Sequence, residues 1–220
     1  MIFQTLDTRE NCRAVYKDGE LVYNQLPDDL THTWTTSQFL QNKDIEYAYL
    51  YSQGSLAEAC PEHLRLELEE TTGLLKAFLL SIAEAKVNPN QHCFYDIVPD
   101  NFLIKLCRIK NKISQYVFEN YERPKNYNFL KDLLITTQSI SHNKLNIDFS
   151  RVRKDCTSFA IRNRLKSIRS ADPYVRYNIF GSKTGRLTTQ SNSFPILTLN
   201  KTFRKILIPN NYKFVEFDFN

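Results

Sequence analysis

The chain starts with short runs of alternating apolar and polar residues and changes to helical periodicity near residue 60. In "CRAVYKDGELVYN", two alternating runs flank Asp18-Gly19, a pattern typical of a β-hairpin with a tight turn. The segment "IEYAYLYSQG" predicts a further strand that ends at Gly54. We therefore expect a small β-rich region over residues 1–58.

Residues 59–148 contain apolar residues at helical spacing. The first helical segment begins at Pro61, carries acidic residues in its first turn and has leucines at positions 64, 68, 75 and 79. The second follows Pro99 and has apolar residues at positions 102, 103, 106, 109, 113 and 117. The third is "NFLKDLLITTQSI". Such stripes indicate helices that bury one face in a core, so we expect a helical region here.

An alternating run returns at the end of the sequence, in "KFVEFDFN". Val215, Phe217 and Phe219 share one face of the predicted strand, and Glu216 and Asp218 share the other. This pattern indicates a half-buried strand whose carboxylates lie on the open face. The chain as a whole is therefore expected to have an α+β fold, with a small β-rich N-terminal region, a helical middle and the beginning of an antiparallel sheet.

Composition narrows the class of protein. The chain has 220 residues, of which 42% are hydrophobic and 24% charged, an ordinary composition for a globular protein. The first residues do not resemble a signal peptide, and no apolar run approaches the roughly 20 residues of a membrane span. The five cysteines are scattered and never in C-x-x-C spacing, which favours reduced thiols. We expect a soluble cytoplasmic protein with no membrane partner.

Positive charge gathers between residues 150 and 170, although the net charge of the chain is only +5. This stretch contains one acid, Asp155, and seven basic residues on a predicted helix: Arg151, Arg153, Lys154, Arg162, Arg164, Lys166 and Arg169. Such a helix can follow a phosphate backbone, or it can simply present a solvated face. The charge pattern alone leaves both interpretations open.

The segment "GSKTGRLTT" has glycines, hydroxyl groups and two basic side chains within nine residues. Backbone amides at glycine, hydroxyl groups and arginine suit a loop that lies against phosphate or a base edge. The segment does not have the spacing of a Walker P-loop. By itself it is equally compatible with a tight structural turn.

The order of motifs after residue 177 resembles the start of the palm in family A DNA polymerases. "TGRLTT" (Thr184–Thr189) is followed by a Phe-Pro loop, then by a basic strand over Arg204–Pro209, then by a strand that ends in Asp218. The "SFP" loop resembles the phage replicase branch of the family. A further segment, "SHNKLNIDFSRVR", resembles the part between exonuclease and thumb, where an aspartate opens the next helix.

The resemblance implies a role for each motif residue. Asp218 and the backbone carbonyl of Phe219 would ligate catalytic Mg²⁺ in a two-ion site, of which this chain holds only part. Arg186, with Thr184 and Gly185, would contact the primer terminus in the minor groove. The other implied DNA contacts are Arg204 and Lys205 near the palm sheet, and Arg162, Arg164 and Lys166 in a basic thumb-like segment over residues 149–176. Residues 177–220 would form the beginning of a palm-like antiparallel sheet.

Several features of the family are missing from the sequence, including the fingers helix and the second catalytic aspartate. We therefore expect an N-terminal fragment or split half of a phage-type replicative polymerase, located in the host cytoplasm and unable to polymerise DNA alone. Its partners would be primer–template DNA, dNTP only in the complete enzyme, and a C-terminal polymerase half. The alternative is a non-catalytic nucleic-acid-binding protein that uses the basic helix and the loop around Thr184–Arg186, called the TGR loop below.

A proofreading exonuclease would begin with a D-x-E motif on a strand, and "KDIEY" supplies Asp44 and Glu46. The run before this motif is polar, and the Y-x-x-x-D element of such domains is missing. The sequence therefore favours a reduced or unrelated N-terminal domain over an active exonuclease.

Overall fold

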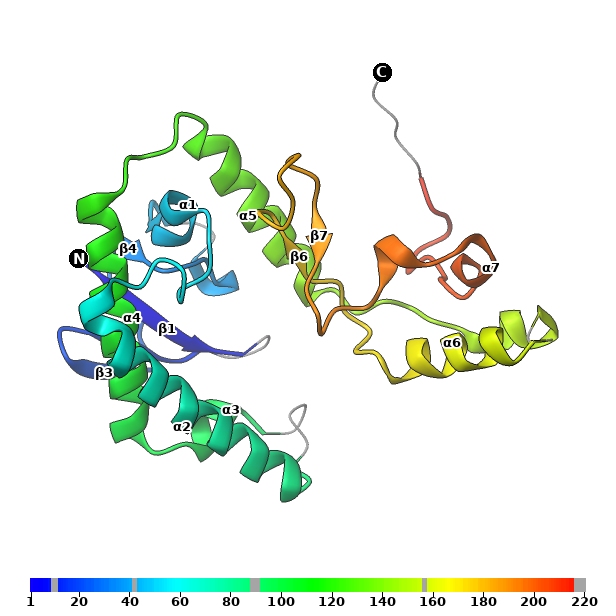
Figure 1. The fold of residues 1–220 in the computed structure, drawn as a ribbon, viewed down its shortest axis with the longest axis horizontal. Helices are drawn as coiled ribbons and strands as arrows, with labels where there is room; N and C mark the ends of the chain where they lie inside the picture. Colours follow the sequence, from blue (N-terminus) through cyan, green and yellow to red (C-terminus); the bar gives the residue numbers. More distant parts are fainter. Residues whose placement is uncertain (9–11, 41–42, 88–91, 156–157, 216–220) are drawn as a thin grey trace. The chain divides into compact units, whose positions relative to one another are not determined.

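The computed structural model describes residues 1–8, 12–40, 43–87, 92–155 and 158–215. It divides the chain into two compact units, Met1–Ile135 (unit 1) and Thr136–Asn220 (unit 2) (Figure 1). The fold is α+β, with an antiparallel sheet near the N-terminus, helices in the middle and a second antiparallel pair of strands later in the chain.

The first sheet of unit 1 contains β1 (Phe3–Asp7), β2 (Cys12–Lys17) and β3 (Glu20–Tyr23) in the order β1-β2-β3, all antiparallel. The predicted hairpin joins β2 and β3. Asp18 and Gly19 both have positive φ, 52° and 96°, as a two-residue type I′ turn requires. The Asp-Gly signal in the sequence is thus confirmed by the backbone of the turn.

The strand predicted over "IEYAYLYSQG" is wrong beyond its first residues. β4 (His32–Thr33) pairs in parallel with β5 (Glu46–Tyr47), and the chain then forms helix α1 (Ala48–Ser52). The N–H of Tyr49 donates to the carbonyl of Trp34 at 2.9 Å, and Gln53 ends the helix with φ 52°. Contacts with a distant segment therefore override the local alternation.

Helices form the rest of unit 1. The three long ones agree with the predicted periodicity, whereas the short ones over residues 38–40 and 94–97 were not predicted. The helices are η1 (Gln38–Leu40), η2 (Glu62–Leu64), α2 (Arg65–Glu84), α3 (Phe94–Ile97), α4 (Asp100–Asn120) and α5 (Tyr127–His142), the last of which continues into unit 2. None of the helices in the described ranges combines the length and the apolar composition that crossing a membrane requires.

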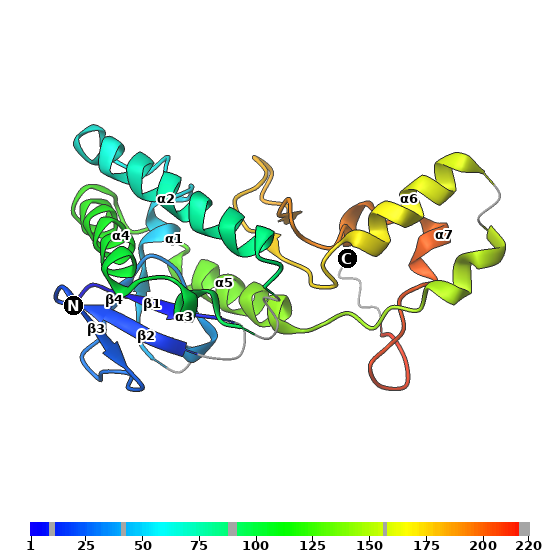
Figure 2. The ribbon, with the colours of Figure 1, turned by 90° about the horizontal axis from the view of Figure 1, so that it is seen from below.

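Helix α4 organises the core of unit 1. All six apolar positions predicted for it are buried: Phe102, Leu103, Leu106, Ile109, Ile113 and Val117. The helix lies between the first sheet and α2 (Figure 2). The predicted stripe of α2 is only partly buried, because Leu68 is in the core while Leu79 is 49% exposed.

Unit 2 is built from short elements around its own core. These are η3 (Phe149–Asp155), α6 (Phe159–Ser170), β6 (Tyr177–Asn178), β7 (Thr188–Thr189), η4 (Ile196–Thr198) and α7 (Lys201–Arg204). The core consists of Val152, Leu165, Ile168, Val175, Phe194, Leu199, Phe203 and Ile206. As the sequence indicated, an aspartate opens the helical segment, since Asp148 accepts a hydrogen bond from the N–H of Ser150 at 2.9 Å.

Two expectations for the end of unit 2 need correction. Arg204 does not lie in a strand but ends the short helix α7, because Asn200 caps this helix by accepting from the N–H of Phe203. Phe214 and Val215 have no regular structure and are 66% and 63% exposed. The part of the predicted strand up to Val215 is therefore not a strand. The remainder of that strand, residues 216–220, lies outside the described residues.

The central role of α4 predicts unequal effects of two leucine truncations. Leu103→Ala removes a fully buried side chain and should lower the free energy of unfolding of unit 1 by about 3 kcal/mol. Leu79→Ala, on a half-exposed position of α2, should cost less than about 1 kcal/mol. Urea unfolding followed by circular dichroism measures both values, and equal losses would contradict this account of the core.

Candidate nucleic-acid interface

The segment "GSKTGRLTT" forms the turn and second strand of a hairpin. β6 and β7 pair antiparallel through Tyr177↔Thr189 and Asn178↔Thr188, and residues 179–187 make the connecting loop. The hairpin is fixed at its base, where the N–H of Gln190 donates to the carbonyl of Arg176 at 2.9 Å. Thr184, Gly185 and Arg186 all lie in the loop, so the structure brings the three predicted motif residues together.

The hydroxyl of Ser182 holds the loop in its conformation. Its Oγ accepts a hydrogen bond from the N–H of Arg186 and donates one to the carbonyl of Arg186, both at 3.0 Å. The hydroxyl oxygen of Thr184 lies 3.3 Å from the hydroxyl oxygen of Ser182. The N–H of Gly185 donates to the carbonyl of Ser182 at 3.3 Å. The N–H of Gly185 and both backbone groups of Arg186 are therefore satisfied within the loop, and the sequence alone did not reveal this role of Ser182.

Two glycines permit this conformation, for different reasons. Gly185 has φ 73°, a left-handed conformation that favours glycine. Gly181 lies against the side chain of Thr188, so a Cβ at this position would overlap the threonine hydroxyl. The first glycine thus allows the turn, and the second allows the loop to pass close to β7.

The tip of the loop is exposed although its backbone is hydrogen-bonded within the loop. Lys183, Thr184, Gly185 and Arg186 are all exposed. Within the described part of the chain, the guanidinium of Arg186 has no hydrogen bond or ion pair. The arrangement presents a long cation with five N–H donors on an internally braced support.

The Phe-Pro loop after the hairpin has a structural role. The guanidinium of Arg176 donates to the carbonyl of Asn192 at 2.7 Å and pairs with Asp172 at 2.5 Å. The N–H of Arg176 donates to the hydroxyl of Ser193 at 2.9 Å, and Phe194 is fully buried in the core of unit 2. These contacts anchor the base of the hairpin to the core.

The predicted basic helix corresponds to α6, which begins at Phe159 with Ser158 as its N-cap. Leu165 and Ile168 are buried, which leaves Arg162 and Lys166 exposed on the opposite side. Arg164 is instead held by the hydroxyl of Thr198 at 3.2 Å. The structure therefore separates the three predicted contacts into two outward cations and one that braces η4.

The other basic residues before and within α6 have partners or are not described. Arg169 stacks over the ring of Phe149, 5.1 Å from its centre. Arg151 pairs with Asp148 at 3.5 Å. Hydrogen bonds from Ser150 hold the pKa of Asp148 below its ordinary value, and Arg151 acts in the same direction. The side chains of Arg153 and Lys154 lie outside the described residues.

Arg204 is less available for a DNA contact than the sequence suggested, because its side chain is engaged within unit 2. Its Nε donates to the carbonyl of Leu199 at 3.2 Å, and it lines an apolar hollow of about 410 Å³ together with Leu197 and Phe214. Lys205 follows as the C-cap of α7 and is exposed. These two residues stand on a different element from the TGR loop.

The exonuclease candidates Asp44 and Glu46 both have cationic partners in unit 1. Asp44, just before β5, is exposed and pairs with Lys131 at 3.1 Å. Glu46 accepts a hydrogen bond from the hydroxyl of Tyr51 and lies 3.6 Å from the guanidinium of Arg123. Across the described ranges, no three or more His, Cys, Asp or Glu side chains form a group able to hold a metal ion.

Tyrosines surround Glu46 and give this cluster a structural role that sequence reasoning missed. Burial, together with the hydrogen bond to Glu46, raises the pKa of Tyr51 above its ordinary value. Burial also raises the pKa of Tyr127 to about 12. The hydroxyl of Tyr127 accepts a hydrogen bond from the N–H of Tyr47 at 2.9 Å, and Arg123 stacks over its ring. The cluster connects the start of α5 to β5.

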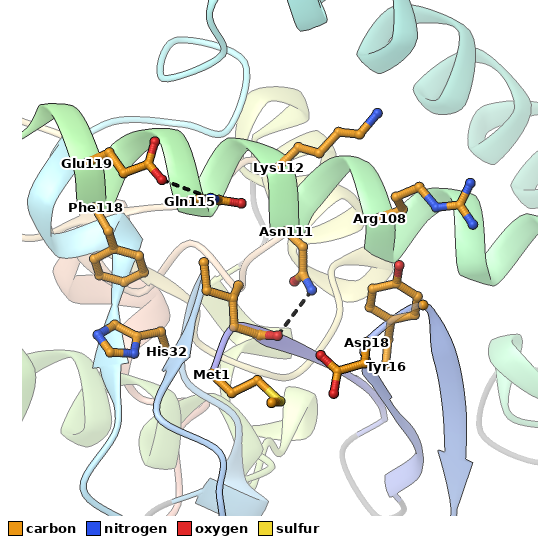
Figure 3. A pocket seen from close by; sticks show the side chains of 12 residues that line it. Met1, Tyr16, Asp18, His32, Arg108, Asn111, Lys112, Gln115, Phe118 and Glu119 are labelled. Carbon is orange, nitrogen blue, oxygen red and sulfur yellow. Dashed lines mark hydrogen bonds between the residues drawn. The ribbon is translucent and has the colours of Figure 1, made fainter.

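Unit 1 also has an open groove of about 540 Å³ between α4 and the N-terminal segment (Figure 3). Asn111 crosses its floor, donating to the carbonyl of Ile2 at 3.3 Å and accepting from Gln4 at 2.9 Å. Charges of both signs line it, including Arg108 and Glu119. The groove does not favour one charge of ligand, and its residues come from segments too distant for a sequence pattern to connect.

The metal-binding prediction falls on residues that the structure does not describe. Asp218 and Phe219 both lie outside the described residues. Comparisons of the chain with protein-family models, with curated proteins and with solved structures find no match.

The close approach at the hairpin predicts opposite effects of two glycine substitutions. Gly181→Ala should lower the free energy of unfolding of unit 2 by about 1–3 kcal/mol, because the added Cβ would displace Thr188. Gly73→Ala, in the exposed middle of α2, should instead raise the stability of unit 1 by up to about 1 kcal/mol. Urea unfolding measures both, and a neutral Gly181→Ala would contradict the tight packing at Thr188.

Proposed function

We propose that unit 2 binds duplex nucleic acid as the beginning of the palm of a family A DNA polymerase. The observation that carries this proposal is the TGR loop, in which an exposed turn is braced internally and Arg186 has no partner among the described residues. A turn needed only to reverse the chain would not require an unpaired arginine at its tip.

The chemistry of Arg186 fits the minor groove. Purine N3 and pyrimidine O2 are acceptors present at every base pair there, so an arginine can contact any pair without reading its sequence. Because Ser182 already satisfies the N–H and carbonyl of Arg186, little backbone order remains to be gained on binding. A braced loop can therefore offer its cation at a low entropic cost.

The basic helix supports the same proposal through phosphate contacts. Arg162 and Lys166 are one turn apart on the exposed side of α6, whereas Arg164 is held by Thr198. Two outward cations at this spacing suit contacts with the nucleic-acid backbone, which are independent of sequence. Arg204 and Lys205 enter the proposal only as secondary phosphate contacts.

Asp218 enters the proposal through the resemblance of the sequence. As the first catalytic carboxylate it would help to hold Mg²⁺, with the carbonyl of Phe219 as a further ligand. Bound Mg²⁺ ions supply the charge that stabilises the attacking and leaving oxygens in phosphoryl transfer to a primer. A complete site needs further carboxylates, so polymerisation and dNTP binding would belong to the complete enzyme with its C-terminal half.

If Arg186 contacts the minor groove, removing either the arginine or the base acceptor should weaken binding by a similar amount. Arg186→Ala should weaken binding to a primer–template by about 1–3 kcal/mol, as loss of a good base contact does. Replacing the terminal primer purine by its 3-deaza analogue should weaken binding of the original protein similarly and leave Arg186→Ala unaffected. Fluorescence anisotropy at one fixed salt concentration measures all four affinities.

Lys183→Ala is the control, because Lys183 is an exposed cation of the same loop. It should remain as sensitive to the 3-deaza purine as the original protein. Additive losses from Arg186→Ala and the 3-deaza purine would exclude the contact. Equal affinity for a primer–template and a blunt duplex would favour the alternative, a nucleic-acid-binding protein that does not recognise a primer end.

The phosphate contacts of α6 predict a change in salt dependence. The double variant Arg162→Gln/Lys166→Gln should reduce the slope of log K against log[salt] by about 1.8, because each lost contact contributes about 0.9. Lys105→Gln, an exposed lysine of α4 in unit 1, should leave the slope unchanged. An unaltered slope in the double variant would mean that α6 presents only a solvated face.

A further inference from the structure

Helix α2 exposes an apolar line on the side opposite its buried face. Leu66, Gly73 and Leu80 are spaced by seven residues, so they lie along one side of the helix. Leu66 is 74% exposed and Leu80 is 66% exposed. Leu74, on one flank of the line beyond Glu70, is 48% exposed. Large apolar side chains gathered in this way on one helix are typical of an interaction surface.

Gly73 lies at the middle of this line, and the packing of the described residues does not require a glycine there. A Cβ at this position would meet no atom of the described residues within 4 Å, and the position is helical and exposed. Glycine in a helix interior is less stable than alanine by about 1 kcal/mol. A missing side chain at this point allows the backbone of another helix to approach closely.

The charges beside the line complement a second copy of the same helix. In an antiparallel pair centred on Gly73, Leu66 lies opposite Leu80 of the partner subunit, since each is seven residues from the centre. Glu69 and Lys76 share one flank, four residues before the centre and three after it. Glu69 therefore lies at the height of the partner's Lys76, with about 1.5 Å of offset along the axis.

The other flank carries Glu70, which would lie at the height of Ala77 of the partner subunit, again with about 1.5 Å of offset along the axis. Leu74 lies further around the helix, about 100° from Gly73. Neither Glu69 nor Lys76 takes part in an ion pair among the described side chains, which leaves both available for these contacts. The surface is thus complementary to itself in shape, apolar contact and charge, as a two-fold interface requires.

We propose that this face of α2 is a self-association surface on which a second copy of the chain packs its own α2 antiparallel, centred on Gly73. The interface is confined to one helix of 20 residues, so it is small by the standard of stable complexes. We expect a dissociation constant on the order of 10 μM. The proposal is independent of the nucleic-acid-binding function of unit 2.

Sedimentation velocity of the full chain over a range of concentrations tests the surface. The original protein should form a dimer, Leu80→Glu should be monomeric, and Leu79→Glu should dimerise normally. Leu79 is the matched control because it is a neighbouring exposed leucine that lies about 120° around the helix from Gly73, beyond the flank of Lys76. A chain that stays monomeric at about 100 μM, tenfold above the expected constant, would overturn the proposal. Equal effects of the two leucine variants would overturn it as well.

Charge reversal tests the identity and direction of the partner. Glu69→Lys and Lys76→Glu should each weaken the dimer on the order of tenfold, because each places like charges across the interface twice. The double variant Glu69→Lys/Lys76→Glu should restore the original affinity. A double variant as weak as the single variants would overturn the antiparallel arrangement.

Gly73→Gln tests the close approach of the two helices, with opposite signs in two measurements. The melting temperature of the dilute monomer should rise, because glutamine is the better helix former. The dimer should weaken, because the larger side chain would separate the two backbones. A dimer that is unchanged by Gly73→Gln would contradict the close contact at the centre.

Discussion

Ser182 donates to and accepts from the backbone of Arg186 with a single hydroxyl, and the candidate site depends on these two hydrogen bonds. They close the loop of the β6–β7 hairpin and satisfy the N–H and the carbonyl of Arg186. Gly181 lets the same loop pass against Thr188, and Arg176 anchors the base of the hairpin to the core. The side chain of Arg186 is left exposed at the tip, with no partner among the residues that the structure describes.

The two units differ in how their cores are built and in where their charged side chains lie. Unit 1 derives its order from one long buried stripe on α4, with the sheet on one side and α2 on the other. Its acidic candidates Asp44 and Glu46 pair with Lys131 and Arg123. Unit 2 has a small core of short elements and holds exposed cations on its hairpin and on α6. The proposed nucleic-acid contacts therefore belong to unit 2, and the proposed self-association surface to unit 1.

The sequence pattern correctly predicted the elements whose conformation depends on neighbouring residues alone. The α4 stripe and the Asp18-Gly19 turn were correct because helical spacing and positive φ are properties of adjacent residues. The strand predicted up to Gly54 was wrong because Tyr49 bonds to Trp34, a contact that no local pattern contains. For the same reason the sequence could not separate Arg164, which bonds to Thr198, from the outward Arg162. The brace formed by Ser182 likewise depends on a loop conformation that composition does not reveal.

The most direct test of the account is a ¹⁵N NMR titration of the chain with a primer–template, with relaxation measured before and after addition. A loop closed by Ser182 should have amide order parameters of about 0.85 over residues 182–186 in the free protein. The Nε–H signal of Arg186 and the amides of this loop should also shift on addition of DNA. Order parameters below about 0.6 in the free loop, or shifts confined to other parts of the chain, would contradict the account.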